Sequence, residues 1–339
     1  MKIRAAILGY GRSGSTMHAG ALEKNSDSFE VVAACDVDPV RRQQAAERFK
    51  CRTYADHGEM LDREKLDLVS VVTRSDQHCA MACDCLSAGV HVLVTKPWAV
   101  NAGEARRMVA AAEKSGRTLM PWLPARWGTD LRRLRQLVSE GAIGNVFLIR
   151  RVVCSFGTRA DWQTERRYGG GYVLNWGPHI VDPPVLLAGS PVKSVYARLK
   201  RVINPGDAED MFFAILNLAD GTVVQAEYTV SMEDLPEWFL QGTHGTIVVR
   251  GRNVTVRRGA PPHPTDPTQY AGMRTEDAKP REEVLGPAQY GDEVEIYGEI
   301  AAALRGERPF PVTPAHALEL SRVLDAIRTA SDEDRVVNL

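Results

Sequence analysis

The chain has 339 residues, which predicts two domains on a prior of about 150 residues per domain. Its formal net charge of −1 provides no basic excess, so nothing in the composition indicates a nucleic-acid partner. The sequence shows no secretory signal and no apolar run near 18 residues, so we expect a cytoplasmic protein without a membrane partner.

The first apolar run, residues 3–8, leads into the motif GYGRSG and a predicted helix. A second apolar run ends in Asp36, 22 residues beyond Gly14. A glycine-rich turn between strand and helix, with an acid at about this distance, is typical of dinucleotide binding. The motif residues predicted to contact the cofactor are Gly9, Gly11, Arg12, Ser13 and Gly14.

Asp36 is predicted to bind the adenosine ribose and to repel a 2′-phosphate, which favours NAD over NADP. Arg41 and Arg42 leave NADP as the less favoured alternative. Asp38 precedes a proline, so we expect it to cap a helix over residues 39–49.

Further apolar strands are predicted to end near Val72, Val94 and Met120, with helices near 76–88 and 101–115. This alternation predicts a doubly wound parallel sheet, that is, a Rossmann fold. Ligands of such sheets bind beyond the carboxyl ends of the strands.

Polar residues follow two of these strands. Ser75 is expected to cap the next helix, and His78 either meets the cofactor or packs in the first helical turn. Lys96 could hold a substrate hydroxyl or relay protons, or be a surface lysine in a loop. The predicted cofactor contacts here are Thr73, Ser75, His78, Thr95 and Lys96.

Three cysteines, Cys79, Cys83 and Cys85, form the spacing C-x3-C-x-C without a second cluster that would complete a zinc site. We therefore expect packed, reduced thiols and no metal.

From about residue 145 the pattern changes to long alternating strands, with Asp220-Gly221 as a hairpin turn. We expect an open, mainly antiparallel sheet with one face covered by helices such as 172–188. The predicted domains are a dinucleotide-binding domain at 1–124 and an α+β substrate-binding and oligomerisation domain at 125–339. The last helices, within 289–330, are expected to pack back across the first domain, and the proline-rich segment 258–288 to be a surface loop or arm.

Residues 158–168 contain Trp162, Tyr168 and three arginines, which suit a sugar ring, although a plain solvated loop is the alternative. The stretch GGGYVLNWGPHIVD then follows, and helical spacing places Asn175, His179 and Asp182 on one face. Because proline is tolerated in a first helical turn, Pro178 predicts a helix start near 174–175. Asn175 would then be either the helix cap or a site residue, and His179 would lie near the positive end of the helix dipole, which keeps it neutral.

Together these motifs resemble the Gfo/Idh/MocA family of oxidoreductases. The resemblance rests on AAILGYGRSG, HVLVTKP, Arg126-Trp127, GAIGNV, GGGYVLNWGPHIVD and the late ERPFPVTPAHALELSRVLDAI. It implies that Lys96, residue 175 and His179 flank the nicotinamide, that Asp182 lies nearer the sugar, and that Tyr290 approaches the nicotinamide. It also implies a homodimer or homotetramer through the exposed face of the C-terminal sheet.

Two residues depart from the family pattern: Thr95 stands where glutamate is usual, and Asn175 where aspartate is usual. We predict an NAD-dependent oxidoreductase acting on a secondary hydroxyl of a sugar, cyclitol or sugar derivative. The predicted catalytic residues are Lys96, Asn175 and His179, with His179 as base or acid and Lys96 polarising the same oxygen. Arg126, Trp162 and Asp182 are the further predicted substrate contacts. The alternatives are glycoside cleavage by transient oxidation with recycled NAD, and a catalytically inactive regulator that binds NAD and a sugar.

Overall fold

The computed structural model describes residues 1–259, 266–270, 272, 279–288 and 290–339. The N-terminal part contains a six-stranded parallel sheet in the order β3-β2-β1-β4-β5-β6, which confirms the predicted Rossmann fold. Its strands are β1 (Ile3–Leu8), β2 (Phe29–Cys35), β3 (Arg52–Tyr54), β4 (Leu68–Val71), β5 (His91–Val94) and β6 (Leu119–Pro121).

Two residues of the Rossmann domain were predicted to cap helices, Asp38 and Ser75, and only Asp38 does so. Asp38 accepts a hydrogen bond from Val40 N at 2.9 Å and caps α2 (Pro39–Phe49), as expected. The expectation for Ser75 is wrong: Ser75 opens a short 3₁₀ turn, η2 (Ser75–Gln77), and its side chain caps no helix. The remaining helices of this layer are α1 (Ala19–Lys24), α3 (His57–Arg63), α4 (His78–Ser87) and α5 (Ala102–Ser115).

The C-terminal part contains a nine-stranded mixed sheet in the order β14-β13-β12-β11-β7-β10-β9-β8-β15. Among the strands that the structure describes in this sheet, only β7 and β10 pair in parallel, and β9 and β10 form the hairpin expected at Asp220-Gly221. The strands are β7 (Val146–Cys154), β8 (Val192–Lys200), β9 (Met211–Leu218), β10 (Val223–Thr229), β11 (Trp238–Gly242), β12 (Gly245–Arg250), β13 (Asn253–Arg258), β14 (Arg281–Val284) and β15 (Val337–Asn338).

The expectation of a loop throughout 258–288 is wrong at its C-terminal end, because β14 pairs with β13 there and Leu285 is buried beyond it. Residues 260–265, 271 and 273–278 of that segment lie outside the described residues.

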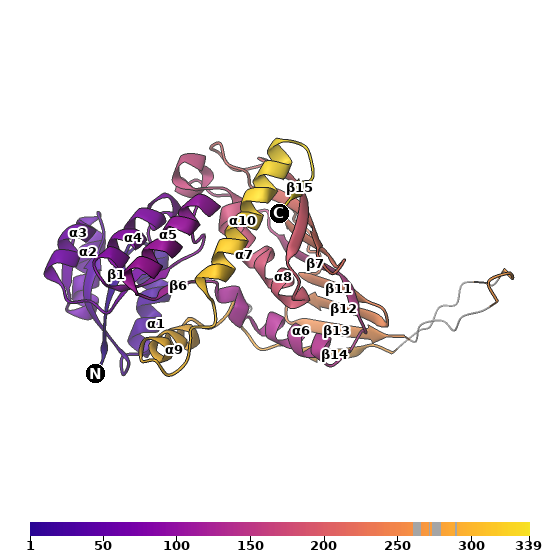
Figure 1. Cartoon of the computed structure of the whole chain (residues 1–339), viewed down its shortest axis with the longest axis horizontal. Coiled ribbons are helices and arrows are strands. Elements are labelled where there is room, and N and C mark those ends of the chain that lie inside the picture. Colours follow the sequence, from indigo (N-terminus) through magenta and orange to yellow (C-terminus); the bar gives the residue numbers. More distant parts are fainter. Residues whose placement is uncertain (260–265, 271, 273–278, 289) are drawn as a thin grey trace.

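Helices cover one face of the large sheet, between it and the Rossmann domain (Figure 1). They are α6 (Thr129–Ser139), α7 (Tyr172–Ile180), α8 (Asp182–Ala188) and α10 (Pro314–Asp332). The single helix expected at 172–188 is thus two helices, since Pro183 and Pro184 lack N–H groups and are tolerated only in the first turn of a new helix.

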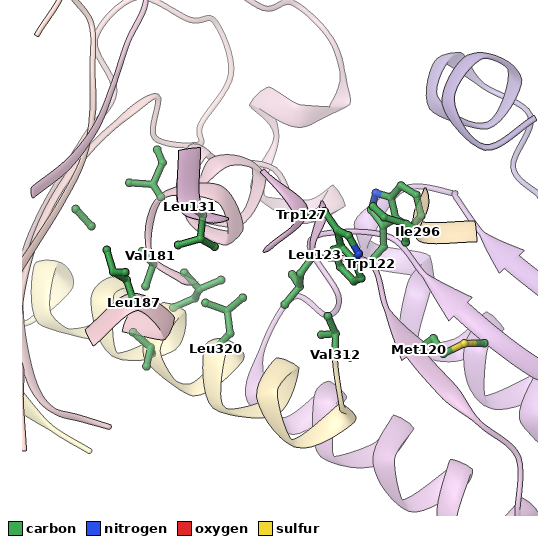
Figure 2. Close-up of a cluster of buried hydrophobic side chains, with 14 of the residues drawn as sticks. Met120, Trp122, Leu123, Trp127, Leu131, Val181, Leu187, Ile296, Val312 and Leu320 are labelled. Carbon is green, nitrogen blue, oxygen red and sulfur yellow. The ribbon is translucent and has the colours of Figure 1, made fainter. Parts of the chain in front are cut away.

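Both late helices reach the Rossmann domain. α9 (Glu293–Leu304) packs on α1, and the Tyr297 hydroxyl lies 2.9 Å from both His18 Nδ1 and Ser70 Oγ. α10 contacts both α5 and β8. Figure 2 shows the apolar side chains that fill the junction, including Trp122, Trp127, Ile296 and Leu320. The Rossmann domain and the C-terminal part with the nine-stranded sheet are therefore joined through one continuous hydrophobic core. No helix in the described part of the chain is long and apolar enough to span a bilayer.

Candidate active site

The GYGRSG turn has the shape needed to receive a pyrophosphate. Gly9 has φ +97°, and a Cβ there would lie 2.6 Å from the Val72 carbonyl oxygen, so only glycine fits. A Cβ on Gly14 would overlap the Gly9 carbonyl, which explains the close helix–strand contact. A Cβ on Gly11 would meet only the tip of Arg41, at 3.5 Å. The space beside Gly11 is therefore open, and the residues present fit a dinucleotide.

Asp36 lies at the end of β2 against this turn. Its carboxylate accepts hydrogen bonds from Tyr10 N at 2.7 Å and from Asp38 N at 2.9 Å. Arg41 places its guanidinium 3.7 Å from the same carboxylate, whereas Arg42 donates to the Asp36 and Val37 carbonyls. Arg41 alone of the two arginines is therefore beside the predicted ribose position.

Lys96 follows β5 at the carboxyl edge of the sheet and reaches α7. Its Nζ donates to the main-chain oxygen and to the side-chain oxygen of Asn175, each at 2.8 Å. Burial lowers the pKa of Lys96 to about 7, and the charges of Arg159 and Arg12 act in the same direction. An amine with such a pKa can both accept and donate a proton near neutral pH.

Asn175 is the fourth residue of α7, which begins at Tyr172 after Gly171. Its N–H donates to the Gly171 carbonyl at 2.9 Å, so the capping interpretation is wrong. Its Nδ2 is buried and has no hydrogen-bond partner among the described residues. Asn175 therefore presents a free donor beside the Lys96 amine.

His179 lies in the last turn of α7 rather than near its start, so the predicted dipole argument is wrong. Pro178 is inside the helix, where it removes one N–H donor just before the helix ends. The pKa of His179 is nevertheless lowered well below its usual value, mainly by burial and also by Lys96 and Arg151. Its Nδ1 is buried, and no described residue forms a hydrogen bond with it. Desolvation and neighbouring cations, not the helix dipole, keep this imidazole neutral.

Aromatic rings extend from His179 in two directions. The Trp176 and Tyr290 ring centroids lie 5.9 and 5.2 Å from that of His179, and Tyr228 lies 5.3 Å from Trp176. Tyr228 is buried, so the members of this row of rings that can stack on the apolar face of a sugar are Trp176 and Tyr290.

The predicted substrate contacts Arg126 and Asp182 are bound to each other. Arg126 donates from Nε at 2.8 Å and from Nη2 at 2.6 Å to the two oxygens of Asp182. The side chains are 10% and 7% exposed, so this bidentate ion pair is largely desolvated. It joins the 3₁₀ turn η3 (Pro124–Trp127) to the first residue of α8.

The other residues expected at the strand ends are also held by protein groups. The ring nitrogens of His78 lie 2.8 Å from the Pro97 oxygen and 3.1 Å from the Thr73 oxygen. The Thr95 hydroxyl donates to the Val71 carbonyl at 3.1 Å. His78 thus ties together the two loops that follow β4 and β5.

The triple glycine before α7 reflects close packing at each position. A Cβ at Gly169 would lie 2.8 Å from Ser75 Cβ, and one at Gly170 would lie 2.6 Å from the Gln163 oxygen. At Gly171 a Cβ would overlap the carboxylate of Glu209, which accepts from Val173 N at the start of α7. Trp162 opens the half-buried 3₁₀ turn η4 (Trp162–Thr164) in the same loop.

Sequence reasoning missed Trp176, Tyr228 and Arg151. Trp176 and His179 are three residues apart in a helix, which was a usable signal. Arg151 occupies an inward position of β7, between inward Ile149 and half-buried Val153, and a charged residue at such a position is also a signal. Tyr228 reaches the row of rings only through tertiary packing.

Known proteins share both parts of this architecture. The family model described as "Oxidoreductase family, NAD-binding Rossmann fold" (GFO_IDH_MocA) matches residues 3–122, and the "GFO/IDH/MocA C-terminal domain" matches residues 131–248. The chain is 24% identical to scyllo-inositol 2-dehydrogenase (NADP(+)) IolW of Bacillus subtilis, over 99% of this chain and 96% of that protein. It is 30% identical to D-apiose dehydrogenase of Paraburkholderia graminis, over 73% of this chain and 67% of that protein.

Among solved structures, the WlbA dehydrogenase of Chromobactrium violaceum, in complex with NADH and UDP-GlcNAcA, is similar with a TM-score of 0.84. It is 26% identical, and the match covers 100% of this chain and 96% of that one. The order of strands, the glycine-rich turn and these matches lead to one conclusion: the chain belongs to the Gfo/Idh/MocA family of NAD-binding oxidoreductases.

Proposed function

We propose that the protein oxidises a secondary hydroxyl of a sugar, cyclitol or sugar derivative with NAD, or reduces the corresponding ketone. The observation that carries this proposal is the position of Lys96, hydrogen-bonded to Asn175 one helical turn before His179. Relatives named as inositol and apiose dehydrogenases support the substrate class. The bound dinucleotide supplies the hydride acceptor or donor.

Within this proposal, Lys96 rather than His179 carries the substrate proton. The pKa of Lys96 is about 7, which suits proton exchange with a hydroxyl near neutral pH. The pKa of His179 is far lower, so its neutral ring orients the same oxygen by a hydrogen bond. Asn175 holds the amine and offers its free Nδ2 as a second donor to developing negative charge on that oxygen.

We further propose NAD as the preferred cofactor, with NADP accepted more weakly. The Asp36 carboxylate repels a 2′-phosphate, but Arg41 is 3.7 Å away and supplies a compensating positive charge. One relative is named as NADP(+)-dependent and a similar solved structure is named in complex with NADH, which supports keeping both dinucleotides in the proposal.

We also propose a homodimer or homotetramer formed through the large sheet. In the described part of the chain, Figure 1 shows helices on one face of this sheet and none on the other. The other face carries half-buried apolar side chains along its central strands, among them Leu148, Phe213, Ile215 and Phe239. Size-exclusion chromatography with light scattering tests this assembly, and Phe213→Glu is expected to give monomers.

The catalytic proposal is tested by NADH fluorescence against sugars, cyclitols, sugar acids and glycosides. We expect NADH formation with at least one class, and its loss in His179→Ala and in Lys96→Met. Release of an aglycone without net NADH would indicate glycoside cleavage instead. Sugar binding without either reaction would indicate a regulator.

A further inference from the structure

Arg151 is a buried cation without a carboxylate partner. It is 3% exposed, and in the described part of the chain it forms no ion pair. Its Nη1 donates to the Val152 and Glu237 carbonyls at 3.3 and 3.1 Å, and its Nε has no partner. Burying an unpaired charge is unfavourable, so its retention calls for a function.

The adjacent arginine shows that this strand can neutralise a guanidinium. Arg150 points to the opposite face of the sheet and pairs with Glu227 at 2.9 Å. Arg151 instead faces the helices and stacks on Trp238, with its Cζ 4.9 Å from the ring centroid. His179 and Tyr290, whose ring centroids lie 5.2 Å apart, both feel its charge. Burial lowers the pKa of His179 and Arg151 acts in the same direction, whereas burial raises the pKa of Tyr290 and Arg151 opposes that rise.

Two carboxylates of this region already accept hydrogen bonds from other groups. The charge of Asp130 adds to burial in raising the pKa of Tyr290, so Asp130 lies in the same region. Its carboxylate accepts hydrogen bonds from the Trp238 indole at 2.8 Å and from Leu131 N. Glu237 accepts from Gly251 N at 2.8 Å. Neither acid is ion-paired with Arg151.

A second arginine approaches the site from the loop before α7. Arg159 is fixed by its main-chain N–H, which donates to Asn204 Oδ1 at 2.7 Å. Its guanidinium is 3.5 Å from Asp161, a loose and half-exposed pair. Asn204 in turn donates to the Tyr172 hydroxyl at 3.0 Å, and the Tyr172 ring lies 4.6 Å from that of Tyr228, so the main chain of Arg159 is held near the row of rings. Burial lowers the pKa of Lys96, and the charge of Arg159 acts in the same direction.

Of the described residues, the chain neighbour of Lys96 and its hydrogen-bond partner carry no negative charge. Asn175 and Thr95 are uncharged, and the free side-chain amide of Asn175 is a donor. Arg12 lies in the GYGRSG turn, where it is predicted to contact the cofactor. Neither Arg159, with its loose pair to Asp161, nor Arg151 has a predicted cofactor contact.

We infer that the substrate is a sugar bearing an anionic group, and that Arg159 and Arg151 select it. The anionic group is either a carboxylate on the ring or a phosphate or diphosphate ester. This inference rests on the proposed function and narrows its substrate class.

The test measures binding to the NADH-saturated full-length protein, by calorimetry and by NADH fluorescence. The probes are paired by the group that carries the charge: methyl β-D-glucuronide against methyl β-D-glucoside for a carboxylate, and glucose 6-phosphate against glucose for a phosphate. UDP-glucose tests a diphosphate ester, with uridine as its control for the nucleoside. We expect at least one anionic probe to bind about tenfold more tightly than its neutral partner, with the preference falling as salt is added. The glucuronide and the phosphate esters distinguish the two sources of charge.

Variants assign the preference to the two arginines. Arg159 is partly exposed, so Arg159→Gln is expected to fold. This variant should lower the affinity for the anionic probe about tenfold and change the affinity for the neutral probe less than about twofold. Arg151→Met should do the same, and Arg151→Lys should restore part of the preference because it keeps the charge. Arg150→Gln, on the opposite face of the same strand, is the control and should change neither affinity.

Equal binding of charged and neutral probes, including no binding of either, overturns this inference. An equal loss of affinity for the charged and the neutral probe in Arg159→Gln also overturns it. Anionic binding without any hydride transfer would overturn the proposed function and leave this inference standing. Turnover of neutral sugars in preference to charged ones would overturn this inference and leave the proposed function standing.

Discussion

Lys96 Nζ donates to both oxygens of Asn175, its main-chain carbonyl and its side-chain amide, at 2.8 Å each. These bonds cross from the Rossmann sheet to α7 of the second domain. They hold the amine in place without supplying a negative charge, so burial determines its protonation.

The pH dependence of oxidation should follow Lys96. Its pKa is lowered from the usual 10.5 to about 7, so the neutral base predominates above pH 7. We expect kcat/KM for oxidation to increase with pH up to about pH 7 and to level off at higher pH. The kcat/KM for ketone reduction should instead decrease as the pH rises through 7. His179 stays neutral through this range and adds no inflection. Lys96→Arg, a permanent cation, should lose about 100-fold in rate together with the inflection. An inflection that persists in this variant would contradict the assignment.

Asn175→Asp should raise the pKa of Lys96, because a carboxylate would then replace a neutral amide 2.8 Å from the amine. We expect the inflection in kcat/KM to move upward by about one unit or more. Asn175→Ala, which removes the side-chain acceptor without adding charge, is the matched control. An unchanged profile in Asn175→Asp would show that Lys96 is not the titrating group.

Cofactor choice should depend on Asp36 and Arg41. Asp36→Ser removes the repulsion of a 2′-phosphate and should raise kcat/KM for NADP by about tenfold relative to NAD. Arg41→Ala should lower kcat/KM for NADP, because the guanidinium lies 3.7 Å from Asp36, where it can offset the repulsion of a 2′-phosphate. It should leave kcat/KM for NAD nearly unchanged, because NAD carries no 2′-phosphate. Steady-state rates with both dinucleotides measure the ratio. A larger loss with NAD than with NADP in Arg41→Ala would contradict this geometry.

Arg126→Met should destabilise the protein by about 3 kcal/mol, because it leaves the Asp182 carboxylate buried without its partner. Adding Asp182→Asn should recover much of this loss. Arg322→Met is the control, since Arg322 and Glu319 form an exposed pair whose removal costs at most about 1 kcal/mol. Urea denaturation measures all three, and equal effects of the two arginine variants would refute a buried ion pair.

Gly170→Ala should destabilise the loop before α7 by about 2 kcal/mol, because a Cβ would lie 2.6 and 2.7 Å from two main-chain oxygens. Gly20→Ala in α1 meets only a side-chain tip at 4.0 Å and should stabilise the protein by up to about 1 kcal/mol. Thermal unfolding of both variants is the measurement. A Gly170→Ala protein as stable as the wild type would contradict the close packing.

The sequence by itself determined the Rossmann domain, because its signals are local. Strand, glycine turn, helix and acid follow one another within about 35 residues, and caps such as Asp38 bond to atoms two residues away. The hairpin at Asp220-Gly221 is local in the same sense. Strand β14 could not be predicted, because it is a short edge strand in a proline-rich segment and exists only through pairing with β13.

Tertiary structure decided the chemistry of the site. The spacing of Asn175, His179 and Asp182 suggested one helical face, but two prolines after Asp182 start a new helix, and Arg126 binds the Asp182 carboxylate. The neutral state of His179 follows from burial and from Lys96 and Arg151, which are distant in sequence. Burial and long-range charge are properties of the packed chain, so no local pattern can encode them.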